Sequence, residues 1–241
     1  MQIKILQWNV WYKEDIEKVA AVLKQIQPDI ASLQELTIGL QEAHPDTVQY
    51  LAEQLGNYNE FHNEVNFGDW SQVNAIISRY PLSNQTSTWI NEPTGSGGFD
   101  DEYRAYLEVN IDINGKELCV GTTHMSFTDR FQETERKYQE TEKLLEYTAD
   151  KQTNFVLTGD LNALPDSYTI KKLSEKLKNA GPDFDQKTWT TKPFSYEGFE
   201  ANTLDWRLDY TFTTPDLKIV SADIIKTNIS DHLPLLLTLE F

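Results

Sequence analysis

The chain has 241 residues, with 38 acidic and 21 basic side chains and a formal charge of −17 at neutral pH. Duplex-binding proteins draw much of their affinity from Lys and Arg contacts with phosphate, and this sequence has no cluster of such residues, so its acidity predicts solvated surface together with some metal-binding carboxylates. Cys119 is the only cysteine, which excludes a disulfide framework, and no apolar run approaches the length of a membrane span.

Strand-like and helix-like segments alternate along the chain without a Pro-, Gly- or Ser-rich linker. This pattern predicts one α/β domain over residues 1–241. The first ten residues include Lys4 and lack both a long apolar core and a small-residue cleavage site, so they do not resemble a signal peptide. We therefore expect a soluble, cytoplasmic protein, and we expect it to be a monomer.

The predicted elements follow from hydrophobic periodicity and from Gly, Pro and Asn breaks. In the first half they are a strand over 3–6, a helix over 13–27, a strand over 30–33, a helix over 46–55, a strand-like segment over 58–82 that is interrupted at 66–70, and a loop over 91–101. In the second half they are a hairpin of 106–113 and 117–122 around Asn114-Gly115, a helix over 130–149, a strand over 155–157, a helix over 168–177, and mostly strand and loop from Trp189 onward.

The most informative stretch runs from Phe155 to Pro165, where a short apolar strand is followed at once by Asp160 and Asn162. Residues two apart in an extended segment point the same way, so a carboxylate and a carboxamide would be presented together at the edge of a sheet. The stretch Gly159 to Asn162 is also a good turn, in which both side chains would cap their own backbone.

The same arrangement recurs at other apolar runs, and this recurrence favours a functional site over an isolated turn. Side chains typical of metal binding and acid–base chemistry lie at or near the ends of six runs. They are Asn9, Glu35, His124, Asp160 with Asn162, Asp209, and Asp231 with His232.

These segments resemble the motifs of the endonuclease/exonuclease/phosphatase superfamily, which includes DNase I-like nucleases, and they occur in the order found in that family. The matching segments are Gln7-Trp8-Asn9-Val10, Leu33-Gln34-Glu35, 75–82, Thr122-Thr123-His124, Thr158-Gly159-Asp160-Leu161-Asn162, Arg207-Leu208-Asp209-Tyr210 and 230–234. The resemblance implies a DNase I-like four-layer α/β sandwich, in which two mixed β-sheets pack face to face with helices outside. It also implies hydrolysis of a phosphoester by an activated water.

The resemblance implies a metal site and a catalytic set. Glu35 would be the principal ligand, with Asn9 beside it and Asp231 completing the site, and carboxylate and amide oxygens suit Mg²⁺ or Mn²⁺. Asp209 would orient His232, Asp160 would position or deprotonate the attacking water, Asn162 would donate to phosphate oxygens, and His124 would bind a non-bridging oxygen. The motifs leave open whether Asp160 or His232 is the base.

Other candidates carry a structural alternative. Arg104 is a candidate for binding substrate phosphate, although a surface ion pair would also explain it, and Arg79 is expected to pair with a nearby acid. A set of aromatic residues in or beside loops would form either a stacking wall or part of the core. This set comprises Phe67, Trp70, Phe99, Tyr103 and Phe127.

These observations predict a divalent-metal-dependent phosphoester hydrolase that acts on a small soluble phosphoester or a short single-stranded nucleic-acid end. The scarcity of Lys and Arg makes duplex DNA an unlikely partner. Two alternatives remain at this point, a catalytically silent binding module on the same scaffold and a duplex-specific endonuclease.

Overall fold

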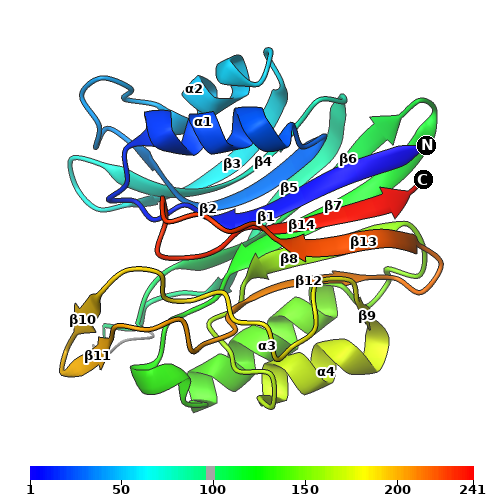
Figure 1. Cartoon of the computed structure of the whole chain (residues 1–241). Helices are drawn as coiled ribbons and strands as arrows, with labels where there is room; N and C mark the ends of the chain where they lie inside the picture. The colour runs from blue at the N-terminus through cyan, green and yellow to red at the C-terminus, as the bar shows by residue number, and fades with distance from the viewer. Residues whose placement is uncertain (96–100) are drawn as a thin grey trace.

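The computed structural model describes residues 1–95 and 101–241, and it consists of four layers in the order helices, sheet, sheet, helices (Figure 1). Two six-stranded sheets pack face to face, and each contains both parallel and antiparallel strand pairs. This arrangement confirms the predicted four-layer α/β sandwich.

The first sheet has the strand order β13-β14-β1-β2-β4-β3. Its strands are β1 (Gln2–Asn9), β2 (Ile30–Ile38), β3 (Asn59–Asn66), β4 (Ser71–Ser78), β13 (Lys218–Ile224) and β14 (Leu235–Glu240). The second sheet has the order β5-β6-β7-β8-β12-β9. Its strands are β5 (Leu82–Asn91), β6 (Arg104–Ile113), β7 (Lys116–His124), β8 (Phe155–Asp160), β12 (Asp209–Thr213) and β9 (Lys178–Asn179).

Helices cover the outer face of each sheet (Figure 1). The first sheet carries α1 (Ile16–Ile26) and α2 (Thr47–Gln54), and the second carries α3 (Glu135–Tyr147) and α4 (Tyr168–Lys176). Side chains cap the amino-terminal ends of all four helices, as the sequence favours; the capping residues are Asp15, Asp46, Thr134 and Ser167. A small hairpin of β10 (Phe194–Tyr196) and β11 (Phe199–Ala201) lies outside both sheets, at the opposite end from the chain termini.

Side chains on the inward faces of the strands form the core between the sheets, and the last inward-facing residues form the site at one end of that core. In β1, Ile3 and Ile5 face the second sheet, whereas Leu6 and Trp8 face the helices. Because the period of a strand is two residues, Asn9 lies on the same face as Ile3 and Ile5, at the end of the intersheet core. His124 follows Val120 in β7 in the same way, and Asp160 follows Val156 in β8.

Two features differ from the expected element boundaries. The helix predicted over 130–149 begins only at Glu135, because Arg130 and Phe131 have left-handed φ values of 50° and 58°, and they form a separate 3₁₀ turn, η1 (Asp129–Phe131). The predicted loop 91–101 begins one residue later, since Asn91 still belongs to β5, and residues 96–100, including Phe99, lie outside the described part of the chain.

Four of the candidate residues expected just beyond strand ends instead lie within strands, whereas Asn162, Asp231 and His232 lie outside them. Asn9, His124 and Asp160 are the last residues of β1, β7 and β8, and Glu35 lies inside β2. The strands run further than their apolar runs because buried hydrogen-bonded residues, such as Gln7 and Thr122, continue the inward face. The positions of these four residues are therefore fixed by the hydrogen bonds of the sheets.

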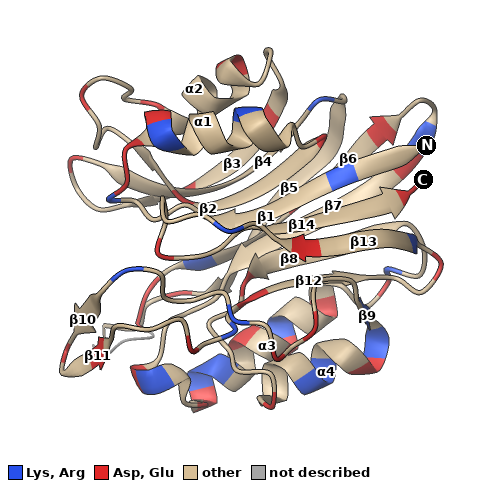
Figure 2. Cartoon of the chain, in the orientation of Figure 1, with Lys and Arg blue, Asp and Glu red and all other residues tan. Residues whose placement is uncertain are grey.

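Charged residues of both signs lie on the helices and in several loops in the view of Figure 2. Figure 2 shows Lys and Arg beside Asp and Glu on α3 and α4, so neither helix presents a purely basic face. Among the residues described, no helix combines the length and the apolar character needed to cross a membrane.

Candidate active site

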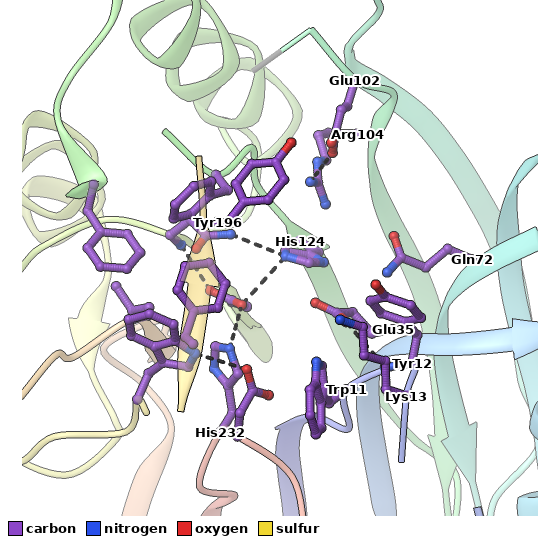
Figure 3. Close-up of a pocket in the computed structure, with 18 of the residues that line it drawn as sticks. Trp11, Tyr12, Lys13, Glu35, Gln72, Glu102, Arg104, His124, Tyr196 and His232 are labelled. Carbon is purple, nitrogen blue, oxygen red and sulfur yellow. Dashed lines mark hydrogen bonds and ion pairs between the residues drawn. The ribbon is translucent and has the colours of Figure 1, made fainter. Parts of the chain in front are cut away.

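The predicted site residues meet in a cleft at one end of the intersheet core (Figure 3). The cleft has a volume of about 570 Å³, and its lining includes Glu35, His124, Asp160, Asn162, Asp231 and His232. Asp209 lies behind this surface, fully buried, and reaches the cleft through His232. The sheet pairing accounts for this convergence, because Asp160 is in register with His124 on one side and with Asp209 on the other.

Asp209, His232 and Asp160 form a chain of contacts. His232 Nδ1 lies 2.9 Å from Asp209 Oδ2, and His232 Nε2 lies 3.5 Å from Asp160 Oδ2. Burial disfavours the charged imidazole, but the surrounding carboxylates of Asp209, Asp160 and Asp231 raise the pKa of His232 well above its usual value. The arrangement therefore favours an imidazolium whose tautomer and orientation are set by Asp209.

Asp160 is crowded between charges of both signs. Burial and the neighbouring Asp209 raise its pKa to about 6, while His232 and a hydrogen bond from Asn9 oppose this increase. Asn9 Nδ2 donates to Asp160 Oδ2 over 3.0 Å and to Glu35 Oε1 over 2.9 Å, so one amide joins two carboxylates. The Asn9 oxygen accepts from the Trp11 backbone, and the amide would have to turn before this oxygen could face a cation.

Glu35 is directed at the cleft by a β-bulge, which re-aims a side chain by inserting one residue into a strand. The pairing of β2 with β4 shifts between Leu33 and Leu36, and Glu35 has a φ of 60°. Burial and the nearby Asp231 carboxylate raise the pKa of Glu35 to about 7, although hydrogen bonds from Asn9 and Tyr12 lower it in part. Two carboxylates thus repel each other on the cleft floor.

His124 and Asn162 form the opposite side of the reactive centre. Asn162 Nδ2 lies 3.2 Å from His124 Nε2 and donates to the Met125 carbonyl over 3.0 Å. Burial, followed by the positive fields of Arg104, His232 and Lys137, lowers the pKa of His124 well below its usual value. His124 is therefore neutral where His232 is charged, although the two imidazoles contact the same Asp160 carboxylate.

Arg104 lines the cleft on the same side as His124 (Figure 3). It forms an ion pair with Glu102, which is the structural role that the sequence offered as an alternative to phosphate binding. Its Nε, however, is buried and has no hydrogen-bond partner among the described residues. A buried donor left unpaired costs free energy, and the guanidinium of Arg104 therefore has capacity to donate that the ion pair with Glu102 does not use. Arg79, in contrast, pairs with Asp29, as expected.

The donor set suits a hard divalent cation. Glu35 and Asp231 offer carboxylate oxygens, and burial together with the field of Asp231 raises the pKa of Glu35, so a cation bound between the two carboxylates would be stabilised. Asp160, Asp209 and His232 also place one donor atom each within 4.8 Å of one another. Both nitrogens of His232 already face carboxylates, so we interpret that second group as an acid–base chain rather than as a cation cage.

Aromatic rings form two walls of the cleft, and the sequence predicted only part of them. Phe67 and Trp70 line the cleft as one stacked pair and Phe127 lines it in a second cluster with Phe194, whereas Tyr103 packs against Trp89. The prediction missed other lining residues, which include Trp11, Tyr12, Gln72, Trp189, Phe194 and Tyr196. No local pattern distinguishes them from core residues, because their exposure depends on how distant segments meet.

The chain belongs to the endonuclease/exonuclease/phosphatase family, whose sequence model matches residues 6–232. A search of curated proteins gave no significant match. Solved structures with the same fold include an endonuclease/exonuclease/phosphatase from Beutenbergia cavernae, with 22% identity, a TM-score of 0.80 and coverage of 99% of this chain and 71% of that one.

Two other structures of this fold are described by activity or ligand. The mannosyl-6-phosphatase Bt3783 of Bacteroides thetaiotaomicron has 14% identity and a TM-score of 0.67, with coverage of 99% of this chain and 100% of that one. TDP2 from D. rerio, complexed with a single-strand DNA product, has 17% identity and a TM-score of 0.69, with coverage of 100% and 99% respectively. At these identities the likeness extends to the fold alone.

Proposed function

We propose that the protein is a divalent-metal-dependent phosphoester hydrolase that uses Mg²⁺ or Mn²⁺. The observation that carries this proposal is the juxtaposition of the crowded Glu35–Asp231 carboxylates with the Asp209–His232–Asp160 chain in a single cleft. A bound cation would neutralise charge on the phosphate and on the departing oxygen. Glu35 and Asp231 would hold it, while Asn9 keeps Glu35 and Asp160 in place.

Side chains of the protein would supply the base and the groups that stabilise the phosphate oxygens. Asp160, with a pKa of about 6, is ionised at neutral pH and suits removal of a proton from the attacking water. His232 is kept protonated by its carboxylate neighbours, so it suits stabilisation of negative phosphoryl oxygens rather than the role of base. Neutral His124 and Asn162 would contact the same oxygens, and the guanidinium of Arg104, which lines the cleft, would bind another part of the phosphate.

We propose a compact substrate, either a small soluble phosphoester or a short single-stranded nucleic-acid end. The aromatic walls suit stacking of a base or sugar, and a formal charge of −17 disfavours a long polyanion. A phosphatase and a single-strand DNA complex among the structures of the same fold are compatible with either choice. The filled set of acid, amide and imidazole groups disfavours a silent binding module, and the mixed charges on the surface disfavour a duplex-specific endonuclease.

The experiment is a hydrolysis screen of phosphomonoesters, phosphodiesters, nucleotides and short oligonucleotides with added Mg²⁺ or Mn²⁺. Glu35→Ala serves as the matched inactive variant, because Glu35 lines the cleft and its removal also relieves the repulsion from Asp231. We expect turnover by the wild type and loss of turnover in the variant, with no loss of the folded state. Wild-type turnover by Glu35→Ala at saturating metal would refute the assignment.

A further inference from the structure

We propose that Trp189 is a positioning residue that holds Asp231 ready to bind the divalent cation. Trp189 Nε1 donates a hydrogen bond of 3.0 Å to Asp231 Oδ2. The inference rests on the proposed function, since it treats Asp231 as one of the groups that hold the cation. Neither the motif resemblance nor hydrophobic periodicity gave Trp189 such a role.

Trp189 is the principal donor to this carboxylate. The other candidate is Ser230 Oγ, which lies 3.3 Å from Asp231 Oδ1 but only 2.7 Å from the Asn9 carbonyl oxygen. A hydroxyl has a single proton, and the shorter contact to Asn9 takes it. The indole N–H therefore fixes the rotation of the Asp231 carboxylate and leaves Oδ1 for a ligand.

The indole can act as a fixed support because its own position is determined on several sides. Trp189 is 3% exposed, and its backbone exchanges hydrogen bonds with Trp206 in both directions. Its ring packs edge to face against Phe131 at 5.3 Å and against Phe194 of the β10–β11 hairpin at 5.0 Å between centroids. A donor held this firmly loses little entropy when it orders its acceptor.

The position of Asp231 matters because this carboxylate lies within the field of Glu35 and raises its pKa. Without a donor, Asp231 would be free to turn away from this repulsion when no cation is bound, and cation binding would then have to restore its orientation. A hydrogen bond from a neutral donor opposes that rotation without adding a competing positive charge. Groups that orient metal ligands in this manner typically contribute about 10- to 100-fold to metal affinity.

The test is titration of Mn²⁺ alone into the metal-free protein by calorimetry, without any substrate. Trp189→Phe removes the N–H and retains an aromatic ring, and we expect it to weaken Mn²⁺ binding by about tenfold or more. Trp206→Phe is the matched control, because Trp206 packs on Phe131 and Phe199 in the same aromatic cluster. We expect it to bind Mn²⁺ as the wild type does.

A second variant, Trp189→Tyr, retains an aromatic ring with a neutral O–H donor and should recover part of the affinity that Trp189→Phe loses. If Trp189→Phe does not fold, Trp189→Tyr is compared with Trp206→Phe: affinity near that of the wild type supports the inference, and a loss of tenfold or more that Trp206→Phe does not share overturns it. At saturating Mn²⁺, the kcat of Trp189→Phe should return towards that of the wild type, whereas a merely structural defect would lower kcat at every metal concentration.

Glu35→Ala separates the two proposals. If this variant loses Mn²⁺ binding while Trp189→Phe binds as tightly as the wild type, the role of Trp189 is wrong and the proposed cation site stands. If Glu35→Ala binds Mn²⁺ as the wild type does, the cation site itself is wrong. Equal losses in Trp189→Phe and Trp206→Phe would assign the effect to packing and would also overturn the inference.

Discussion

Replacement of Glu35 by Gln should make the metal-free protein more stable at alkaline pH. The carboxylate lies beside Asp231, and burial together with this neighbour raises its pKa from 4.5 to about 7. Gln has the same shape without the charge, and its oxygen can still accept the hydrogen bond that Asn9 Nδ2 donates to Glu35 Oε1 over 2.9 Å. The substitution therefore removes repulsion and desolvation of a charge while it retains most of the packing.

The size of the effect follows from the two pKa values. Each pH unit between them corresponds to about 1.4 kcal/mol, so ionised Glu35 costs the folded state about 3 kcal/mol above pH 7. The Tyr12 backbone N–H donates to Glu35 Oε2 over 3.3 Å, and in the Gln variant it would face the amide nitrogen instead. Loss of this hydrogen bond reduces the stabilisation by about 1 kcal/mol. We expect a net stabilisation of about 2 kcal/mol at about pH 8.

The change of folding stability with pH shows that ionisation of Glu35 is destabilising. A carboxyl with a raised pKa in the folded state binds its proton more tightly there than in the unfolded chain, so stability falls as pH rises from 4.5 towards about 7. The gain from Glu35→Gln should therefore be small near pH 4.5 and reach its full size above pH 7. Urea unfolding in the presence of a chelator, followed by circular dichroism across this range, measures it.

The control is Glu42→Gln, which alters an exposed carboxylate and should give a difference that hardly changes with pH. Added Mg²⁺ or Mn²⁺ should then stabilise the wild type, by about 2.7 kcal/mol at a hundredfold excess over Kd, and should stabilise Glu35→Gln much less. If the variant is less stable than the wild type at pH 8 without metal, or if the difference is independent of pH, the reasoning about crowded carboxylates is refuted.

Three further outcomes concern turnover. Asp209→Asn should lower kcat less than His232→Ala, because the first change alters an orienting group and the second deletes the imidazole. We expect His232→Ala to lower kcat by about 10²- to 10⁴-fold. The reverse order of kcat values would reject these roles. Arg104→Met should raise KM by about tenfold with a smaller change in kcat, whereas Arg79→Met, at an ion pair outside the cleft, should change neither. Short oligonucleotides or nucleotides should show a higher kcat/KM than plasmid DNA, and preferred cleavage of duplex with a steep loss in salt would contradict the proposed substrate class.

The sequence by itself determined the alternation of elements, the family and the reactive residue types. The hairpin around Asn114-Gly115 and the helix ended by Pro28 follow from local backbone preferences. The positions of Asn9, His124 and Asp160 on the inward face of their strands also follow from sequence, since the period of two is a local property. The ordered motifs then allowed the four-layer sandwich to be predicted through the resemblance.

Only the tertiary structure decided how these groups act on one another. The bulge that aims Glu35, and the raised pKa values of Glu35, Asp160 and His232, depend on burial and on charges from strands far apart in the chain. The same is true of the contact between Trp189 and Asp231, which are separated by 42 residues. Local propensity carries no information about such distances, because hydrogen bonds and Coulomb interactions across the cleft exist only once both sheets have packed together.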